Sequence, residues 1–379
     1  MYDLLKGARV IDLTSVVLGP VATQYLGDFG ADVIKVEPPT GDIFRYARPS
    51  RNEDMGAGFL NFNRNKRAVT LNLKDKDDLT KLKGLLAEAD VLVHNMRPAA
   101  AERLGLGAHD AQRVNPRLIY CAAPGFGSRG RYADRPAYDD IIQAASGVAA
   151  LNRDNEGAPR FLPTVLCDKV GGMHLAMAVL AGLTHQAKTG KGCVIEVPMF
   201  EGMVAFTMPE HLSGRTFRPA EGDIGYERLL SPYRRPYRTK DGYIGVLPYN
   251  GDHWRRVLEL LGSELADEGW VQSSSERSSR VGELYAILDQ AMAQRTTEDW
   301  LAVLRELDIP CTPVNSPEDL LSDEHLMDAE LFEDREHPSE GAIRAIRSPF
   351  WVEGLEYKAD DPAPRKARQG LDITWRDRE

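Results

Sequence analysis

The first half of the chain alternates short apolar runs with segments of helical length. The apolar runs are rich in β-branched residues and predict buried strands at 9–16, 31–39, 66–73 and 90–96. Between these runs, the patterns at 21–30 and 74–89 predict helices. Strands separated by single helices indicate parallel βαβ units with right-handed crossovers. We therefore expect a large α/β domain built on a doubly wound, mostly parallel sheet.

The pattern continues to about residue 200 and then changes. A buried run at 117–127, a long apolar helix at 169–188 and a strand at 192–199 extend the large domain. Glycine, proline and charged residues become frequent from 211 onward, so we expect a linker at 201–225. The large domain is accordingly placed at 1–200.

A smaller α+β domain is predicted at 226–324. Asp241-Gly242 lies between two alternating runs and predicts a β-hairpin. Amphipathic helices follow, the last with a threonine cap and an acidic first turn, at 253–262, 283–294 and 296–308. We expect residues 325–379 to return to the large domain, with an edge strand at 347–352.

Composition and charge narrow the class of protein. A chain of 379 residues exceeds one ordinary core, in agreement with two domains. A formal net charge of −10 argues against nucleic acid as a partner. The apolar runs are too short for a membrane span, and residues 1–13 lack the pattern of a secretory signal, so we expect a cytoplasmic protein.

Several common sites are disfavoured by missing motifs. Gly19 is followed by Pro20, which has no backbone N–H for a pyrophosphate, and the G-x-G-x-x-G motif is absent, so no nicotinamide cofactor is expected. The histidines are dispersed, and the four cysteines form no C-x-x-C pair, so no metal site is expected. A G-x-S-x-G nucleophile motif is also absent.

The stretch FLPTVLCDKVGGMHLAM at 161–177 holds the strongest candidates for chemistry. Cys167 follows an apolar run with no basic neighbour before it, which favours a buried, inert thiol. Asp168 lies where the chain enters a helix, and Gly171 and Gly172 leave space nearby. A helix N-cap is the plain structural interpretation of such an aspartate, and a nucleophilic carboxylate is the functional one.

Motifs across more than half of the chain separate these two interpretations. They include LLKGARVIDLT at 4–14, GADVIKVEPP at 30–39, NKRAVTLNL at 65–73, DVLVHNMRP at 90–98, RPAYD at 135–139 and CDKVGGMH at 167–174. In this order they resemble the family III CoA-transferases, which include formyl-CoA transferase and carnitine CoA-transferase and have α-methylacyl-CoA racemase as a relative. The resemblance implies a Rossmann-like large domain and a homodimer of two interlocked chains.

The resemblance also implies the chemistry. It places a carboxylate nucleophile at Asp168, which would carry CoA as an aspartyl-CoA thioester between an acyl-CoA donor and a carboxylic acid acceptor. For this chemistry, we take backbone N–H groups near Gly171 and Gly172 as candidate oxyanion donors. Coenzyme A would enter as part of the substrate, and no metal is required. The family positions that contact CoA correspond here to Val16, Leu71, Asn95, Met96, Arg103, Leu104, Tyr138 and Met199.

The chain departs from the family pattern at several positions. Val17 stands where the formyl-CoA branch has a glutamine, which disfavours exchange between formate and oxalate. Pro38 replaces a phosphate-binding arginine, with Arg45 or Arg48 as candidate substitutes. Tyr138 stands where the racemases have a histidine, which disfavours racemisation. An acyl-CoA racemase and a catalytically silent CoA-binding subunit remain the alternatives, and the sequence does not identify the acceptor acid.

Overall fold

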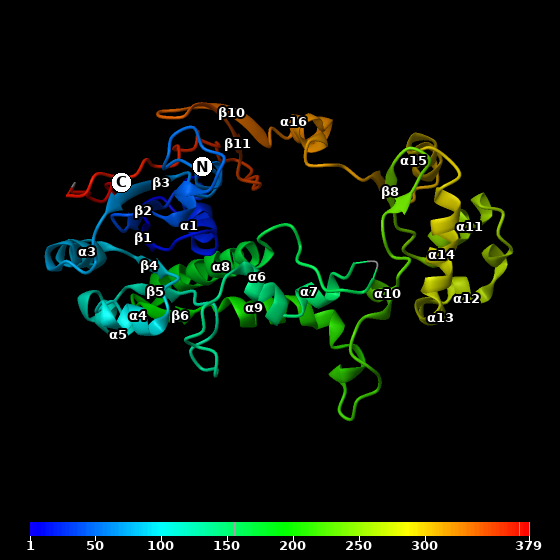
Figure 1. Cartoon of the computed structure of the whole chain (residues 1–379), viewed down its shortest axis with the longest axis horizontal. Coiled ribbons are helices and arrows are strands. Elements are labelled where there is room, and N and C mark those ends of the chain that lie inside the picture. Colours follow the sequence, from blue (N-terminus) through cyan, green and yellow to red (C-terminus); the bar gives the residue numbers. More distant parts are fainter. Residues whose placement is uncertain (155, 371, 379) are drawn as a thin grey trace. The chain divides into compact units, whose positions relative to one another are not determined.

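The computed structural model describes residues 1–154, 156–370 and 372–378. The chain divides into two compact units, one formed by Met1–Thr207 with Asp328–Glu379 and the other by Met208–Met327. Figure 1 shows the elements of both units along the chain.

A six-stranded parallel sheet forms the centre of the first unit. Its strand order is β3-β2-β1-β4-β5-β6, and β1 lies between β2 and β4, with Ile11 paired to Ile34 and Leu92. The strands are β1 (Arg9–Leu13), β2 (Asp32–Glu37), β3 (Lys66–Thr70), β4 (Val91–His94), β5 (Ile119–Ala122) and β6 (Cys193–Glu196). The predicted α/β fold with a parallel sheet is confirmed.

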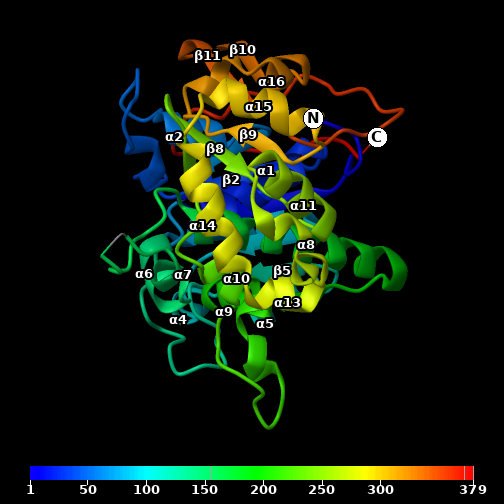
Figure 2. The same ribbon diagram turned by 90° about the vertical axis from the view of Figure 1, so that its right-hand side faces the viewer.

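Helices cover both faces of this sheet because alternate strand residues are apolar on both sides. On one face, Val10 and Val91 share a core with α1 (Leu18–Asp28) and α8 (Leu166–Thr189), which lie side by side in Figures 1 and 2. On the other face, Ile11 and Leu92 share a core with α3 (Lys76–Glu88) and α5 (Ala108–Val114).

Shorter elements complete the first unit. They are η1 (Ile43–Tyr46), α2 (Ala57–Phe62), α4 (Pro98–Arg103), α6 (Asp139–Ala145), α7 (Val148–Leu151) and the antiparallel hairpin of β10 (Phe332–His337) and β11 (Gly341–Ile346). The edge strand predicted at 347–352 is wrong, because the strand pairing ends at Ile346 and the following residues are irregular. Helix α9 (Met199–His211) occupies much of the segment expected as a linker.

The second unit packs helices against a small antiparallel sheet. Its sheet order is β7-β8-β9, and β7 and β8 form the hairpin predicted at Asp241-Gly242. The Thr296 side chain accepts the Asp299 N–H in a capping box, which confirms the threonine cap. The elements are η2 (Ser213–Thr216), α10 (Glu227–Leu230), β7 (Tyr237–Arg238), β8 (Tyr243–Val246), α11 (Gly251–Leu260), η3 (Glu264–Asp267), α12 (Gly269–Gln272), α13 (Ser274–Ser279), α14 (Val281–Met292), α15 (Thr297–Glu306), β9 (Cys311–Pro313), η4 (Asp319–Ser322) and α16 (Glu324–Asp328).

Helix α8 exceeds the apolar length expected from the sequence. Its 24 residues include an 18-residue window of mean hydropathy 1.3, so by length and composition alone it could cross a membrane. Half of that window is buried inside the protein, where α8 packs against α1 and against β5 and β6. No apolar run long enough to span a membrane is expected from the sequence, and α8 is longer than expected. Its packing in the core accounts for its apolar composition.

Candidate active site

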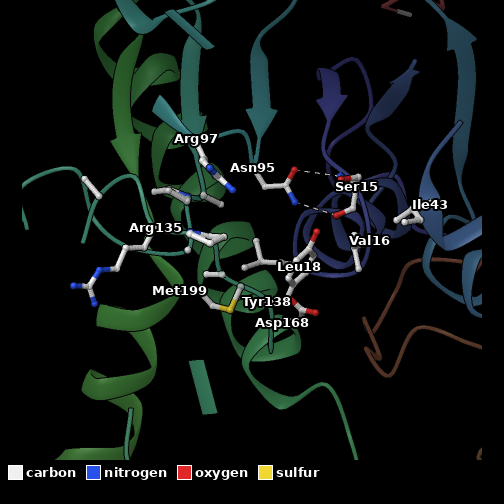
Figure 3. Close-up of a pocket in the computed structure, with 16 residues that line it drawn as sticks. Ser15, Val16, Leu18, Ile43, Asn95, Arg97, Arg135, Tyr138, Asp168 and Met199 are labelled. Atoms are coloured by element: carbon white, nitrogen blue, oxygen red, sulfur yellow. Dashed lines mark hydrogen bonds between the residues drawn. The ribbon is translucent and has the colours of Figure 1, made fainter. Parts of the chain in front are cut away.

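The site begins where the strand order of the parallel sheet reverses, between β1 and β4. Ser15 follows β1 and Asn95 follows β4, and the Asn95 side chain joins the two ends. The Ser15 N–H donates to Asn95 Oδ1 at 3.2 Å, and Asn95 Nδ2 donates to the Ser15 carbonyl at 3.0 Å (Figure 3). The crevice at such a reversal is where open α/β sheets bind ligands.

Two neighbouring cavities open at this point. The first has a volume of about 250 Å³, and Asp168 lies on its wall. The second has a volume of about 490 Å³ and extends over the ends of β2 and β3. Ser15, Ile43 and Asn95 line both cavities, so together they form one elongated cleft in the first unit. An extended ligand could reach from the second cavity to Asp168.

Asp168 is poised for chemistry rather than for helix capping. It is the third residue of α8, whose N-cap position is occupied by Val165. Its side chain is 7% exposed, and among the described residues no donor forms a hydrogen bond or ion pair with the carboxylate. Its backbone N–H donates to Asp139 Oδ1 at 3.1 Å. The carboxylate is thus free to react with a molecule in the first cavity.

The surroundings of Asp168 disfavour its charged form. Burial, reinforced by the neighbouring Asp139 carboxylate, raises the pKa of Asp168 to about 7. Asp139 is held in place by Gln143, whose Nε2 donates to Asp139 Oδ2 at 2.6 Å. A poorly solvated carboxylate is more readily converted into a neutral ester than one stabilised by donors, so this environment suits a nucleophile.

Cys167 and the two glycines do not take part directly. Cys167 is fully buried, and burial, with the charges of Asp139 and Asp168, raises the pKa of its thiol to about 12. Gly171 and Gly172 lie beyond the first four residues of α8, so their N–H groups belong to the helical ladder, and the oxyanion role predicted for them is wrong. Their absent side chains instead admit α1, because a Cβ at Gly172 would lie 2.7 Å from the Leu18 carbonyl oxygen.

Seven of the eight predicted CoA-contacting residues line the cleft. The first cavity, which also contains Asp168, is lined by Val16, Tyr138 and Met199. The second cavity is lined by Leu71, Met96 and Leu104. Asn95 lines both cavities. Arg103 ends α4, is exposed, and lines neither cavity. The structure therefore brings the predicted residues together, except for the arginine expected to bind phosphate.

Arg45 cannot replace the arginine missing at Pro38. Its guanidinium is fully buried and makes two bonds to Glu37, at 2.7 and 2.6 Å, while it stacks over the Phe59 ring at 3.7 Å. Arg48 is exposed and lines neither cavity. Among the described residues around the second cavity, Lys74 is the basic one, and its side chain is exposed. Lys74 directly follows a predicted strand, but nothing in its sequence surroundings singled it out.

Other cleft residues also escaped sequence reasoning. Arg97 and Arg135 line the first cavity, and Arg135 stacks over the Tyr132 ring at 3.8 Å. Asp139 contacts Asp168 although the two are far apart in the chain. Arg97 follows Asn95 and Met96 in the N-M-R-P stretch, so its position carried a signal, whereas the pairing of Asp139 with Asp168 depends on how α6 packs against α8.

Known proteins with the same fold and similar sequence are CoA-transferases. The chain is 33% identical to succinyl-CoA:glutarate CoA-transferase of Mus musculus over 344 residues, which cover 89% of this chain and 78% of that protein. It is 34% identical to acetyl-CoA:oxalate CoA-transferase of Acetobacter aceti over 314 residues, covering 81% and 80%. The crystal structure of Rv3272 from M. tuberculosis superposes with a TM-score of 0.83 at 30% identity, covering 96% of each chain.

A family model gives the same result over almost the whole sequence. The model described as CoA-transferase family III matches residues 5–368, which include most of the first unit, all of the second and every residue of the cleft. The order of the motifs, the parallel sheet and the buried aspartate beside the cleft agree with this match. The protein belongs to CoA-transferase family III.

Proposed function

We propose that the protein transfers CoA from an acyl-CoA to a free carboxylic acid and carries CoA on Asp168 as a thioester. The observation that supports this most directly is the Asp168 carboxylate, which is buried, accepts no hydrogen bond from the residues that the structure describes and lies on the wall of the first cavity. The second cavity offers room for the nucleotide end of CoA. The pantetheine arm would then pass Ser15, Ile43 and Asn95, which line both cavities.

The proposed reaction exchanges one activated carbonyl for another. An Asp168 oxygen attacks the acyl-CoA carbonyl, the C–S bond breaks, and a mixed anhydride and CoA thiolate result. The thiolate attacks the Asp168 carbonyl and expels the donor acid as its carboxylate. The acceptor carboxylate then reverses both steps and leaves as its own thioester. No ATP is consumed, and exclusion of water protects the anhydride and the thioester from hydrolysis.

Covalent CoA on Asp168 is the direct test of this proposal. After incubation with an acyl-CoA and no acceptor, mass spectrometry of the acid-quenched protein should show a CoA adduct, located by digestion to the peptide that contains Asp168. Hydroxylamine should remove the adduct, and an acceptor acid should discharge it as a new acyl-CoA. Unmodified, hydroxylamine-resistant protein during active turnover would contradict the thioester route. Deuterium exchange at the substrate α-carbon without an acceptor would instead indicate the racemase alternative.

The position of Lys74 gives a prediction about the nucleotide end. We expect K74A to raise KM for acyl-CoA about tenfold, equivalent to about 1.4 kcal/mol, because a lysine–phosphate contact is lost, while kcat stays near its original value. K76A is the matched control, because Lys76 is also exposed but does not line the second cavity. Steady-state kinetics at several salt concentrations measure both. Equal KM values for the two variants would remove Lys74 from the proposed CoA site.

The acceptor, the assembly and the location are also part of the proposal. Two relatives are named for the dicarboxylates glutarate and oxalate, so dicarboxylic acids head the panel of acceptors to screen. We further propose an interlocked homodimer in the cytoplasm. Met173 and Met177 on α8 and Phe206 on α9 are exposed apolar side chains that a partner chain could cover, and the mass of the protein in solution tests for two chains.

A further inference from the structure

Val16, on the wall of the first cavity, has an unusual backbone. Its φ angle is 71°, in the left-handed region, where β-branched residues are rare because their side chains crowd the backbone. Such a conformation persists only when neighbouring groups hold it, and it is often found at functional sites. The groups that hold Val16 are therefore of interest for the chemistry of the cleft.

Asp42, which lies on the wall of the second cavity, holds Val16. The Val16 N–H donates to Asp42 Oδ1 at 3.1 Å, and the same oxygen accepts the Phe44 N–H at 3.0 Å. Lys35 Nζ lies 3.0 Å from Asp42 Oδ2 and also donates to the Thr14 carbonyl at 2.9 Å. Both side chains are buried, so this ion pair is shielded from water.

Asp42 is itself fixed, so it can act as a rigid support. Its N–H donates to Glu37 Oε2 at 2.8 Å, and Glu37 is held by the two bonds from Arg45. From the other side, the Asn95 amide bonds both the N–H and the carbonyl of Ser15. The loop between β1 and α1 is thus clamped on two sides at the point shared by the two cavities. Figure 3 shows the Asn95 side of this clamp.

The clamped loop leads directly into α1, which packs against α8, the helix that carries Asp168. Leu18, the first residue of α1, lines the first cavity and packs against Gly171, where a Cβ would lie 2.7 Å from Leu18 Cδ1. A change in the φ angle of Val16 would move both its own side chain and Leu18. The width of the cleft beside Asp168 therefore depends on the left-handed turn at Val16.

We propose that Asp42 is a positioning residue for CoA binding, which acts by holding Val16 in its left-handed conformation. The inference rests on the proposed function in placing CoA in this cleft. Lys35 pairs with the carboxylate of Asp42, and the Asp42 oxygen that accepts the Val16 N–H is the atom that holds Val16 in place. A variant that keeps this oxygen should keep the cleft, and a variant that loses it should allow Val16 to relax.

The test combines D42A, D42N and V16G with the double variant D42A/V16G. We expect D42A to raise the Kd for CoA at least about tenfold, measured by calorimetry, and to leave kcat at saturating acyl-CoA within about threefold. D42N retains an acceptor oxygen and should stay within about threefold of the original Kd. Glycine adopts a φ of 71° without a side-chain clash, so D42A should change the Kd by less than about threefold when V16G is already present.

A matched control distinguishes positioning from general stability. Asp28 is another buried aspartate, which is paired with Arg64 and lines neither cavity, so D28A should lower the melting temperature without changing the Kd for CoA. A D42A variant that behaves like D28A would overturn the proposal. So would a tenfold loss of affinity that is undiminished in the V16G background, because Asp42 would then act by another route.

Two further outcomes are informative. If D42A alone fails to fold, D42A/V16G should fold, and failure of both would overturn the inference. If the unmodified protein neither binds CoA nor forms the Asp168 adduct, the proposed function fails. Melting temperatures then test whether Asp42 holds Val16 in its left-handed conformation. In that case D42A should lower the melting temperature less in the V16G background than in the original protein, and an equal loss would overturn the clamp.

Discussion

Replacing Asp168 with asparagine is expected to lower kcat for CoA transfer by about 10⁴-fold or more, to the level of the uncatalysed exchange. An amide has no anionic oxygen with which to attack a thioester. The aspartyl-CoA thioester therefore cannot form in this variant. The side chain keeps its size, and the carboxylate has no hydrogen bonds to the described part of the chain to lose, so binding of CoA should change little. Calorimetry with CoA and steady-state kinetics measure the two effects separately.

The matched control for this variant is D140N. Asp140 is the neighbour of Asp139 on α6, but its side chain is exposed and lines neither cavity, so its removal should leave both kcat and CoA binding near their original values. D168E tests placement, because one extra methylene displaces the attacking oxygen and should cost a large part of kcat. If D168N retained a tenth of the original turnover, the nucleophile would have to be sought elsewhere in the cleft.

The sheet and its helices could be predicted because their signals are local. Strands such as β1 and β4 are apolar on both faces, and the patterns of α1 and α3 have helical spacing, so the alternation of strand and helix defines a parallel sheet. The hairpin of β10 and β11 was missed for the opposite reason. Charged residues fill the middle of β10, and in the described part of the chain the two strands pair only with each other, so no buried run marks them.

Many residues of the candidate site could be predicted because the family resemblance gave their positions in the sequence. The resemblance did not give their contacts. What the sequence could not show was how charges pair. Arg45 was a candidate for phosphate until the structure showed it buried, bound to Glu37 and stacked over the Phe59 ring. The contact of Asp139 with the Asp168 N–H and the support of Val16 by Asp42 join separate elements, so no local pattern encodes them.

The raised pKa of Asp168 should make the protein less stable as the pH rises from about 4 to about 7. Between these values the unfolded chain has released this proton and the folded protein still holds it, so the folded state binds more protons and loses stability with rising pH. A rise in pKa from 3.8 to about 7 corresponds to about 4 kcal/mol of unfolding free energy once the pH exceeds 7. The amide in D168N does not titrate, so this variant should be more stable than the original protein at pH 8 by up to this amount.

Urea unfolding of the original protein and D168N at pH 4, 6 and 8 measures this difference, which should be near zero at pH 4 and largest at pH 8. D139N removes the neighbouring charge but not the burial, so its own curve should show part of the gain. A constant difference across the range would show that Asp168 titrates normally. The same penalty bears on catalysis: conversion of the carboxylate to a neutral thioester relieves both its burial and its repulsion by Asp139, so the environment that weakens the fold favours the enzyme-bound intermediate.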